Sequence, residues 1–270
     1  MDLSVTGPKI YFEIPILGGI KITQTTVSLL VVTILLITLS YFLTRKLTKR
    51  PGRAQVIVEK LVTMLYNLVE DTMGKHNLKF APYIGTLFLC SIFGTLIGMT
   101  QLFRSTTADL SVTLAWALVT TGLVWYHNIK NFGFLAWLKG FTEPIVVMTP
   151  MNIVSEIANP ISMAFRHFGN VAGGGVLTAL IYNALASLSA IVFGWLPDMI
   201  AEGVPFLQVG IPAVLSIYFD LFSGFVQAFV FCLLTMVYVG AACPPPEEIL
   251  AEKLEKQEKK ELKKAKKANK

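Results

Sequence analysis

The chain has 270 residues, of which 54% are hydrophobic and only 15% are charged, and its mean hydropathy is +0.62. A soluble domain carries about a quarter charged residues, so this composition excludes an ordinary soluble protein. The net charge of +6 comes from local basic segments. Because no aromatic residues or nucleic-acid motif accompany these segments, they do not indicate nucleic-acid binding.

The first third of the chain predicts an external segment, a membrane helix and an amphipathic helix. Residues 1–25 consist of short apolar pieces broken by proline and glycine, without the pattern of a cleaved signal peptide. Residues 26–44 are uncharged, and about 20 apolar residues suffice to span a bilayer. In residues 54–75 apolar positions recur at helical spacing opposite a polar face. This pattern favours a helix on the cytoplasmic membrane surface; a helix facing a protein partner is the alternative.

Two basic segments predict the orientation of the chain in the membrane. One is the sequence TRKLTKRPGR at residues 44–53, and the other is the charged tail at residues 247–270. Cytoplasmic loops carry an excess of lysine and arginine, so we expect both segments inside and the N-terminus outside. This orientation is typical of a multi-pass protein of a bacterial inner (plasma) membrane.

Residues 80–128 predict a membrane hairpin, and residues 144–242 predict a pair of long helices. The hairpin consists of two apolar runs joined by a short external turn, in which Thr107 or Asp109 can cap the second helix. The two later helices are longer than one perpendicular crossing needs, so we expect a steeply tilted antiparallel pair. The predicted fold is an all-α polytopic membrane protein with about five to six membrane helices and one interfacial amphipathic helix.

Polar residues recur along one face of each long helix. The stripe on the first helix contains Asn159, Ser162, Arg166 and Asn170, and the stripe on the second contains Ser216, Asp220, Gly224 and Gln227. An arginine at the centre of a bilayer costs about 2.5–3.5 kcal/mol on insertion scales, and it cannot relieve this cost by losing its proton. Arg166 therefore needs a water-lined cavity or a nearby carboxylate. A structural ion pair with Asp220 is one explanation. A fixed charge that meets a mobile or external carboxylate is favoured, because buried ion pairs stabilise only weakly.

The other candidates carry weaker signals. A plain interhelical hydrogen bond explains Gln227 as well as an ion path does, whereas Asp220 fits an aqueous path better than a satisfied core position. His167 points about 100° away from Arg166 on a helix, which favours packing over a proton relay. The residues that we consider as further lining of an ion path are Asp109, Glu156, Asn159, Ser162, His167 and Ser216.

The sequence contains no nucleotide-binding motif and no histidine or cysteine cluster with metal-ligand spacing. Its three cysteines, Cys90, Cys232 and Cys243, predict small apolar side chains rather than a disulfide framework. We therefore expect no cofactor and no catalytic site within this chain itself.

Three stretches of the sequence resemble subunit a of the Fo sector of F-type rotary ATP synthases. They are TADLSVTLAWAL at 107–118, NPISMAFRHFGNVAGG at 159–174 and VQAFVFCLLTMVYV at 226–239. The resemblance extends from about residue 55 to residue 242, in the family's order and spacing. It implies a stator subunit packed against a ring of c subunits, with two offset aqueous half-channels that couple ion flow to rotation. It also implies b-type peripheral stalk subunits and a soluble F1 ATPase head as partners.

The resemblance assigns roles to individual residues. Arg166 matches the arginine that holds the incoming ring carboxylate ionised and blocks leakage between the half-channels. Gln227 matches the polar residue facing that arginine. Asn170 matches an asparagine of the channel region, and Asp109 matches an acidic residue near the external hairpin.

The chain departs from the family pattern at three positions. Some members carry a glutamate at the position of Gly175 and a histidine at that of Asp220, and Arg–His–Phe here replaces the commoner Arg–Leu–Phe. Our hypothesis is that Asp220 supplies the inlet-channel carboxylate that Gly175 lacks.

Two other protein classes are alternatives. An ion-coupled secondary transporter also places polar residues on broken helices, but no inverted repeat is visible in the sequence. A purely structural membrane scaffold does not explain Arg166, Asp220 and Gln227 together. The sequence leaves both H⁺ and Na⁺ open as the coupling ion, and it does not set the physiological direction or the size of the c ring.

Overall fold

The structure is a computed structural model that describes residues 10–15, 20–45, 47–100, 102–142, 145–193, 217–251 and 254. The described residues are mainly helical, with one two-stranded hairpin. Five of the described helices are long and apolar enough to cross a membrane. The predicted class, an all-α polytopic membrane protein, is confirmed.

A short β-hairpin precedes the first helix. Strands β1 (Ile10–Ile14) and β2 (Ile20–Thr23) are antiparallel, and Lys21 forms an exposed ion pair of 3.6 Å with Glu13 across the hairpin. This hairpin is not predicted from the sequence. Its signal is the enrichment in Ile, Tyr and Phe, which is typical of strands but is weak in runs of four or five residues.

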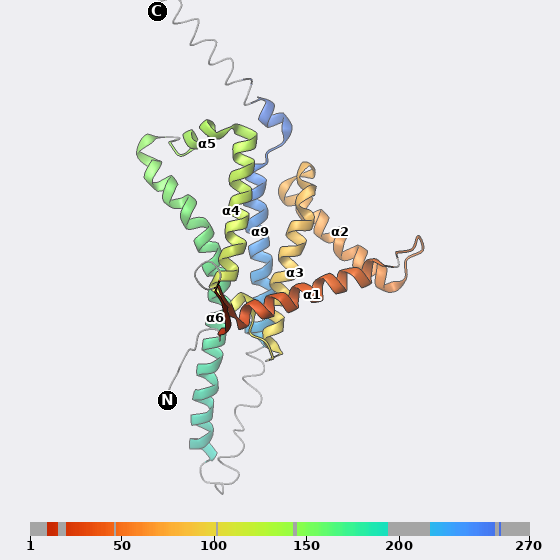
Figure 1. Ribbon diagram of the computed structural model, residues 1–270, viewed down its shortest axis with the longest axis vertical. Coiled ribbons are helices and arrows are strands. Elements are labelled where there is room, and N and C mark those ends of the chain that lie inside the picture. The colour runs from red at the N-terminus through yellow and green to blue at the C-terminus, as the bar shows by residue number, and fades with distance from the viewer. Residues whose placement is uncertain are drawn as a thin grey trace, which may run out of the picture.

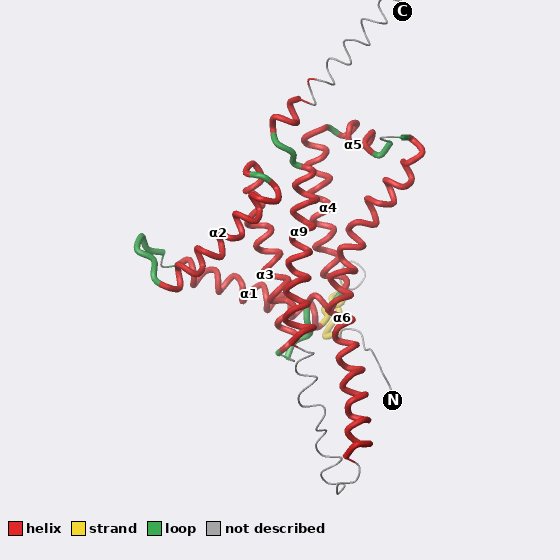
Figure 2. The backbone as a smooth tube through the Cα atoms, turned by 180° about the vertical axis from the view of Figure 1, so that it is seen from behind, coloured by secondary structure: helices red, strands yellow, loops and turns green. Residues whose placement is uncertain are grey.

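Helices α1 (Gln24–Thr44) and α2 (Arg53–Met73) extend to one side of the molecule, as both views of the chain show (Figures 1 and 2). The Thr23 side chain caps α1 by accepting a hydrogen bond from the backbone of Thr26. Large apolar side chains of α1 are exposed, as expected where lipid is the solvent. In α2 only the C-terminal end packs into the core, through Val69 and Met73.

The next elements form a hairpin. The short 3-10 helix η1 (Lys75–Phe80) leads into α3 (Ala81–Met99), and η2 (Thr106–Ala108) precedes α4 (Leu110–Phe132). Asp109, one of the two predicted caps, is the N-cap of α4 and accepts from the backbone of Ser111 at 2.9 Å. Gly94 and Gly98 let the loop lie against α3, because a Cβ at either position would overlap Thr106 or Ser105.

The last part of the chain contains the longest helix. After α5 (Phe134–Gly140) and η3 (Val146–Met148), α6 runs without a described break over Thr149–Phe193, which is 45 residues. A π-helical segment, η5 (Ile217–Ser223), is followed by α9 (Gly224–Ala242). Figure 1 shows α6 and α9 running in opposite directions, as predicted; the two helices meet over part of their length, and α6 then extends beyond the other helices.

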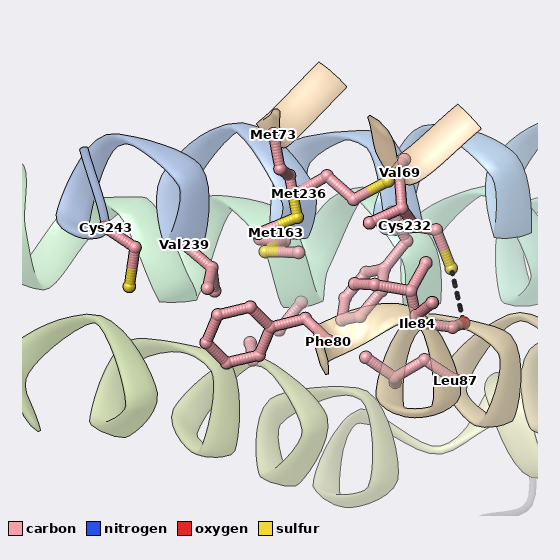
Figure 3. Packing of buried hydrophobic residues seen from close by; sticks show 14 residues of the cluster. Val69, Met73, Phe80, Ile84, Leu87, Met163, Cys232, Met236, Val239 and Cys243 are labelled. Carbon is pink, nitrogen blue, oxygen red and sulfur yellow. Dashed lines mark hydrogen bonds between the residues drawn. The ribbon is translucent and has the colours of Figure 1, made fainter. Parts of the chain in front are cut away.

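The hydrophobic core lies where α2, α3, α4, α6 and α9 meet (Figure 3). Met163 of α6, Ile84 of α3 and Met236 of α9 are each at most 4% exposed. Figure 3 also shows the thiol of Cys232 directed at the backbone oxygen of Ile84, a contact of 3.8 Å. All three cysteines are free thiols. This core positions the face of α6 that carries the polar stripe.

Side chains from two other elements hold the C-terminal end of α9. Asn77 of η1 donates to the backbone oxygen of Cys243 at 2.9 Å, and a ring nitrogen of His76 lies 2.8 Å from the same oxygen. Asn131 of α4 donates to the backbone oxygen of Ala242 at 2.9 Å. The last carbonyl groups of a helix lack partners within it, so these contacts satisfy them and fix the position of α9 along its axis.

Candidate functional site

The two faces of α6 carry different kinds of residue. Its buried face carries Pro160, Met163, Ala164, His167 and Gly174, which recur at intervals of three, four and seven residues. The exposed face carries Asn159, Ser162, Arg166 and Asn170. A helix turns 100° per residue, so one face can meet the core while the other faces outward. The predicted polar stripe therefore lies on a free surface of this chain.

Arg166 is exposed and lacks a carboxylate partner among the described residues. Among the described residues, the ion pairs join Lys21 to Glu13 and Lys75 to Glu70, and neither involves Arg166. The structure describes the backbone of Asp220 but not its side chain, and Ser216 lies outside the described residues. A guanidinium group on an apolar surface needs a negative partner or water, so Arg166 is suited to receive a carboxylate from outside the chain.

Asn170 and Gln227 join the two long helices. The side-chain amide of Asn170 donates to Oε1 of Gln227 at 2.6 Å. Gln227 is 4% exposed, whereas Asn170 is exposed. The pair therefore reaches from the outer surface of α6, one turn beyond Arg166, into the contact between α6 and α9.

His167 lies in the core and contacts three other helices. Its Nε2 is 3.0 Å from the hydroxyl of Ser91 in α3, and its ring makes edge contacts with Trp116 of α4 and Phe231 of α9. His167 and Ser91 are both 0% exposed. This environment agrees with the packing role favoured by the sequence, and it adds a specific hydrogen bond.

Asp109 lies at the opposite end of the α3–α4 hairpin from α5. Its Oδ2 accepts from the hydroxyl of Thr25 in α1 at 2.6 Å, while Oδ1 caps α4. Both carboxylate oxygens are thus engaged in tying α1 to α4. Asp109 is half-buried, and the structure does not bring it into contact with Arg166.

Glu156 lies on α6, closer to α5 than Arg166 does. Its Oε1 accepts from the indole nitrogen of Trp125 at 2.5 Å, and Trp125 packs against Trp137 of α5. Asn159 and Ser162 are exposed on the same helix, between Glu156 and Arg166. These residues form a polar line along α6 that ends among aromatic residues typical of a membrane interface.

The structure thus brings Asn170 into contact with Gln227. It leaves Arg166 exposed, without a carboxylate partner among the described residues. Three residues that contact the predicted set were not predicted from the sequence: Ser91, Thr25 and Trp125. Serine and threonine are common in membrane helices, so their type alone carries no signal. Only long-range proximity identifies them.

Comparison with known proteins shows which family this chain is similar to. A family model described as ATP synthase A chain matches residues 25–240. The protein named "ATP synthase subunit a, sodium ion specific" from Propionigenium modestum is 31% identical over 266 residues, which cover 87% of this chain and 84% of that protein. ATP synthase subunit a of Desulforamulus reducens is 34% identical, with 71% and 68% covered. That of Moorella thermoacetica is 30% identical, with 84% and 94% covered.

Proposed function

The chain belongs to the ATP synthase A chain family, and we propose that the polar stripe of α6, with the facing residues of α9, forms its ion path. The chain is the ion-translocating stator subunit of a rotary ATP synthase, a membrane protein that works in a complex with a c ring and a stalk. Nothing in these similarities supports the alternative of an ion-coupled secondary transporter. The coupling ion is H⁺ or Na⁺.

Arg166 acts as the fixed positive charge of the path. The observation that carries this proposal is its exposure on α6 without a carboxylate partner among the described residues. A carboxylate of the c ring that arrives at Arg166 is stabilised in its ionised form, because an adjacent positive charge favours the charged state. The ring site therefore releases its ion there and takes up another where Arg166 is absent.

The same charge separates two half-channels. One opens to the outside and the other to the cytoplasm, and a cation cannot pass directly between them because the guanidinium repels it. The ion instead travels on the ring through nearly a full rotation. Each elementary charge that crosses the membrane potential contributes about 2.3 kcal/mol per 100 mV, which biases the direction of rotation.

Asn170 and Gln227 keep the surface beside Arg166 polar and well defined. Their hydrogen bond of 2.6 Å spans α6 and α9 next to the place where the ring carboxylate must approach. Amide groups can solvate an ion or a water molecule without carrying charge themselves. We assign to them the lining of the path at the level of Arg166.

Asp220 is the carboxylate that we assign to the inlet half-channel. It belongs to the π-helical segment directly before α9, seven residues before Gln227. Segments of π-helix are rare and occur frequently at functional sites. Gly175, where some family members carry a glutamate, has no atoms within 4 Å of an added Cβ. A single carboxylate at Asp220 thus takes the place of the one absent from Gly175.

The finer assembly follows from the same proposal. The partners are the c-subunit ring, b-type peripheral stalk subunits, the F1 head reached through the stalks, and the lipid bilayer. The N-terminus lies outside a bacterial inner membrane and the charged tail of residues 247–270 lies in the cytoplasm. The apolar exposed face of α2, which includes Ile57, Leu61 and Val62, then lies on the cytoplasmic membrane surface.

Replacement of Arg166 tests the proposed function. We expect Arg166→Ala to abolish ATP synthesis driven by an imposed ion gradient in membrane vesicles, and to raise the passive ion conductance of the complex. Both effects have one cause: without the guanidinium, the ring carboxylate is not held ionised and the half-channels are not separated. Synthesis rates and ion leak are measured on vesicles that contain equal amounts of assembled complex.

Arg53→Ala is the matched control, because Arg53 is an exposed arginine at the start of α2, distant in sequence from the stripe. It should leave both synthesis and leak unchanged. Normal synthesis by assembled Arg166→Ala complexes would contradict the proposed function.

A further inference from the structure

His167 stands out because it is a buried polar residue directly beside the exposed Arg166. Its hydrogen bond to Ser91, 3.0 Å long, joins α6 to α3, and both residues are fully buried. The rings of Trp116 and Phe231 pack against the imidazole at centroid distances of 6.2 and 5.4 Å. His167 carries no role in the proposed transfer of ions.

Two contacts follow one another along the antiparallel helices. His167 meets Phe231, and three residues later Asn170 meets Gln227, which precedes Phe231 by four residues on α9. Residues three or four apart lie on one side of a helix. His167 and Asn170 thus form two successive rungs between α6 and α9.

We propose that the Ser91–His167 hydrogen bond is a positioning device, which fixes the rotation of α6 so that Arg166 and the Asn170–Gln227 pair face the c ring. This inference rests on the proposed function. A helix packed only through apolar side chains can rotate slightly at little cost, whereas a buried hydrogen bond is directional and costly to leave unmade. Arg166, adjacent to His167, turns with it.

The contacts favour positioning over proton transfer. Nδ1 of His167 is buried and has no well-formed hydrogen bond among the described residues, so no proton acceptor continues the chain from Ser91. The next hydroxyl along α3, that of Thr95, donates to the backbone oxygen of Ser91 rather than to its side chain. A backbone carbonyl oxygen has no proton to pass on, so the hydroxyl path is interrupted there.

Variants of the hydrogen-bonded pair test the proposal in vesicles with the intact ATP synthase. We expect Ser91→Ala and His167→Leu each to lower ion-driven synthesis per assembled complex about fivefold, the effect of one lost hydrogen bond. The double variant should fall no further, because both changes remove the same bond. His167→Gln should restore most of the rate, since its amide can reach Ser91 as Nε2 does but cannot carry a proton. Tyr83→Phe, which removes the partly buried hydrogen bond of 3.1 Å to Thr120, should change nothing.

A geometric measurement distinguishes this inference from the proposed function. Cysteines are placed at Asn170 and Gln227 in a chain whose three natural cysteines are replaced by alanine, and the rate of disulfide formation is recorded. Ser91→Ala should slow it about fivefold and Tyr83→Phe should not. Unchanged cross-linking and synthesis in Ser91→Ala and His167→Leu would overturn positioning, as would a His167→Gln variant as defective as His167→Leu. If the complex with the unaltered chain did not synthesise ATP, only the proposed function would be refuted. The positioning inference would still be testable, because cross-linking does not depend on ion movement.

Discussion

Arg166 and His167 are consecutive residues whose environments are opposite. The first is exposed on α6 and the second is fully buried against three helices. Because consecutive residues of a helix point about 100° apart, one of them can face lipid or a partner while the next is held in the core. The neutral His167 can thus hold the permanent charge of Arg166 in place. The chain thereby keeps a guanidinium on its surface without a carboxylate partner among its described residues.

The proposed inlet carboxylate gives the first prediction at this scale. Asp220→Asn should lower ion-driven ATP synthesis about a hundredfold, the lower range of what a positioned proton-transfer group contributes. The carboxylate should be replaceable from α6: Gly175→Glu should recover part of the rate in the Asp220→Asn background, because an added Cβ at Gly175 has no atom within 4 Å. Initial synthesis rates in vesicles measure both effects.

The control for this rescue is Gly175→Gln in the same Asp220→Asn background. Glutamine has the size of glutamate but no charge, so it should restore nothing. If Asp220→Asn synthesised ATP at the rate of the unaltered chain, Asp220 would have no part in the ion path.

At the scale of single residues, the sequence predicts which face of a helix a residue occupies, because helical spacing determines it. The stripe from Asn159 to Asn170 follows from intervals of three and four, and the structure places these residues on one exposed face. The partner of His167 does not follow, because Ser91 is 76 residues away and belongs to another helix. Contacts of this kind depend on how helices pack, which no local pattern encodes.

Among the elements, small residues decide how closely the helices and their loops approach. Gly94 and Gly98 of α3 leave room for the loop before α4, and Gly224 at the start of α9 lies against Thr95 of α3. Small residues at helix contacts are characteristic of membrane proteins, where close backbone approach replaces the hydrophobic effect as a driving force. The end of α3 is therefore sensitive to the addition of single methyl groups.

Gly94→Ala tests this sensitivity. The added Cβ would overlap Oγ1 of the buried Thr106, so the loop must shift, at a cost of about 1–3 kcal/mol. We expect less assembled complex in membranes and a lower temperature at which the purified complex dissociates. Gly122→Ala in α4 is the matched change, since its Cβ meets no atom within 4 Å. It should be neutral or slightly stabilising, because alanine favours a helix over glycine by about 1 kcal/mol. Equal effects of the two changes would show that the Thr106 contact is unimportant.

The helices with strong sequence patterns are predicted, and the elements without such patterns are not. Long uncharged runs predict α1, α3 and α4 because a bilayer crossing requires them. The β1–β2 hairpin and the π-helical segment at Ile217–Ser223 were not predicted, because both are short and depend on contacts with neighbouring elements. The π-helical segment includes Asp220, so the place where local patterns fail coincides with a proposed functional residue.

At the scale of the whole molecule, the basic residues of the chain concentrate in two segments of the sequence rather than along its apolar helices. The basic segment at residues 45–53 follows α1, and the cap formed by Asn77 and Asn131 closes the end of α9 that precedes the charged tail. The loop that contains Ser105 and Asp109 lies at the other end of the α3–α4 hairpin. Overall composition and charge predict this fold class, because lipid burial and the positive-inside rule act on the chain as a whole.

This asymmetry gives a prediction about sidedness. A cysteine at Gly52, an exposed position in the basic segment with no atoms within 4 Å of its Cβ, should react with a membrane-impermeant maleimide only when the cytoplasmic face is accessible. A cysteine at Leu102, which is 78% exposed in the loop after α3, should react only from outside. Labelling is compared in intact cells and in inverted vesicles that contain the assembled complex. The unaltered chain reports the background, since Cys232 and Cys243 are buried and Cys90 lies within α3. Reaction of both positions from the same face would refute the predicted orientation, because one candidate membrane crossing, which contains α3, lies between Gly52 and Leu102 in the described part of the chain.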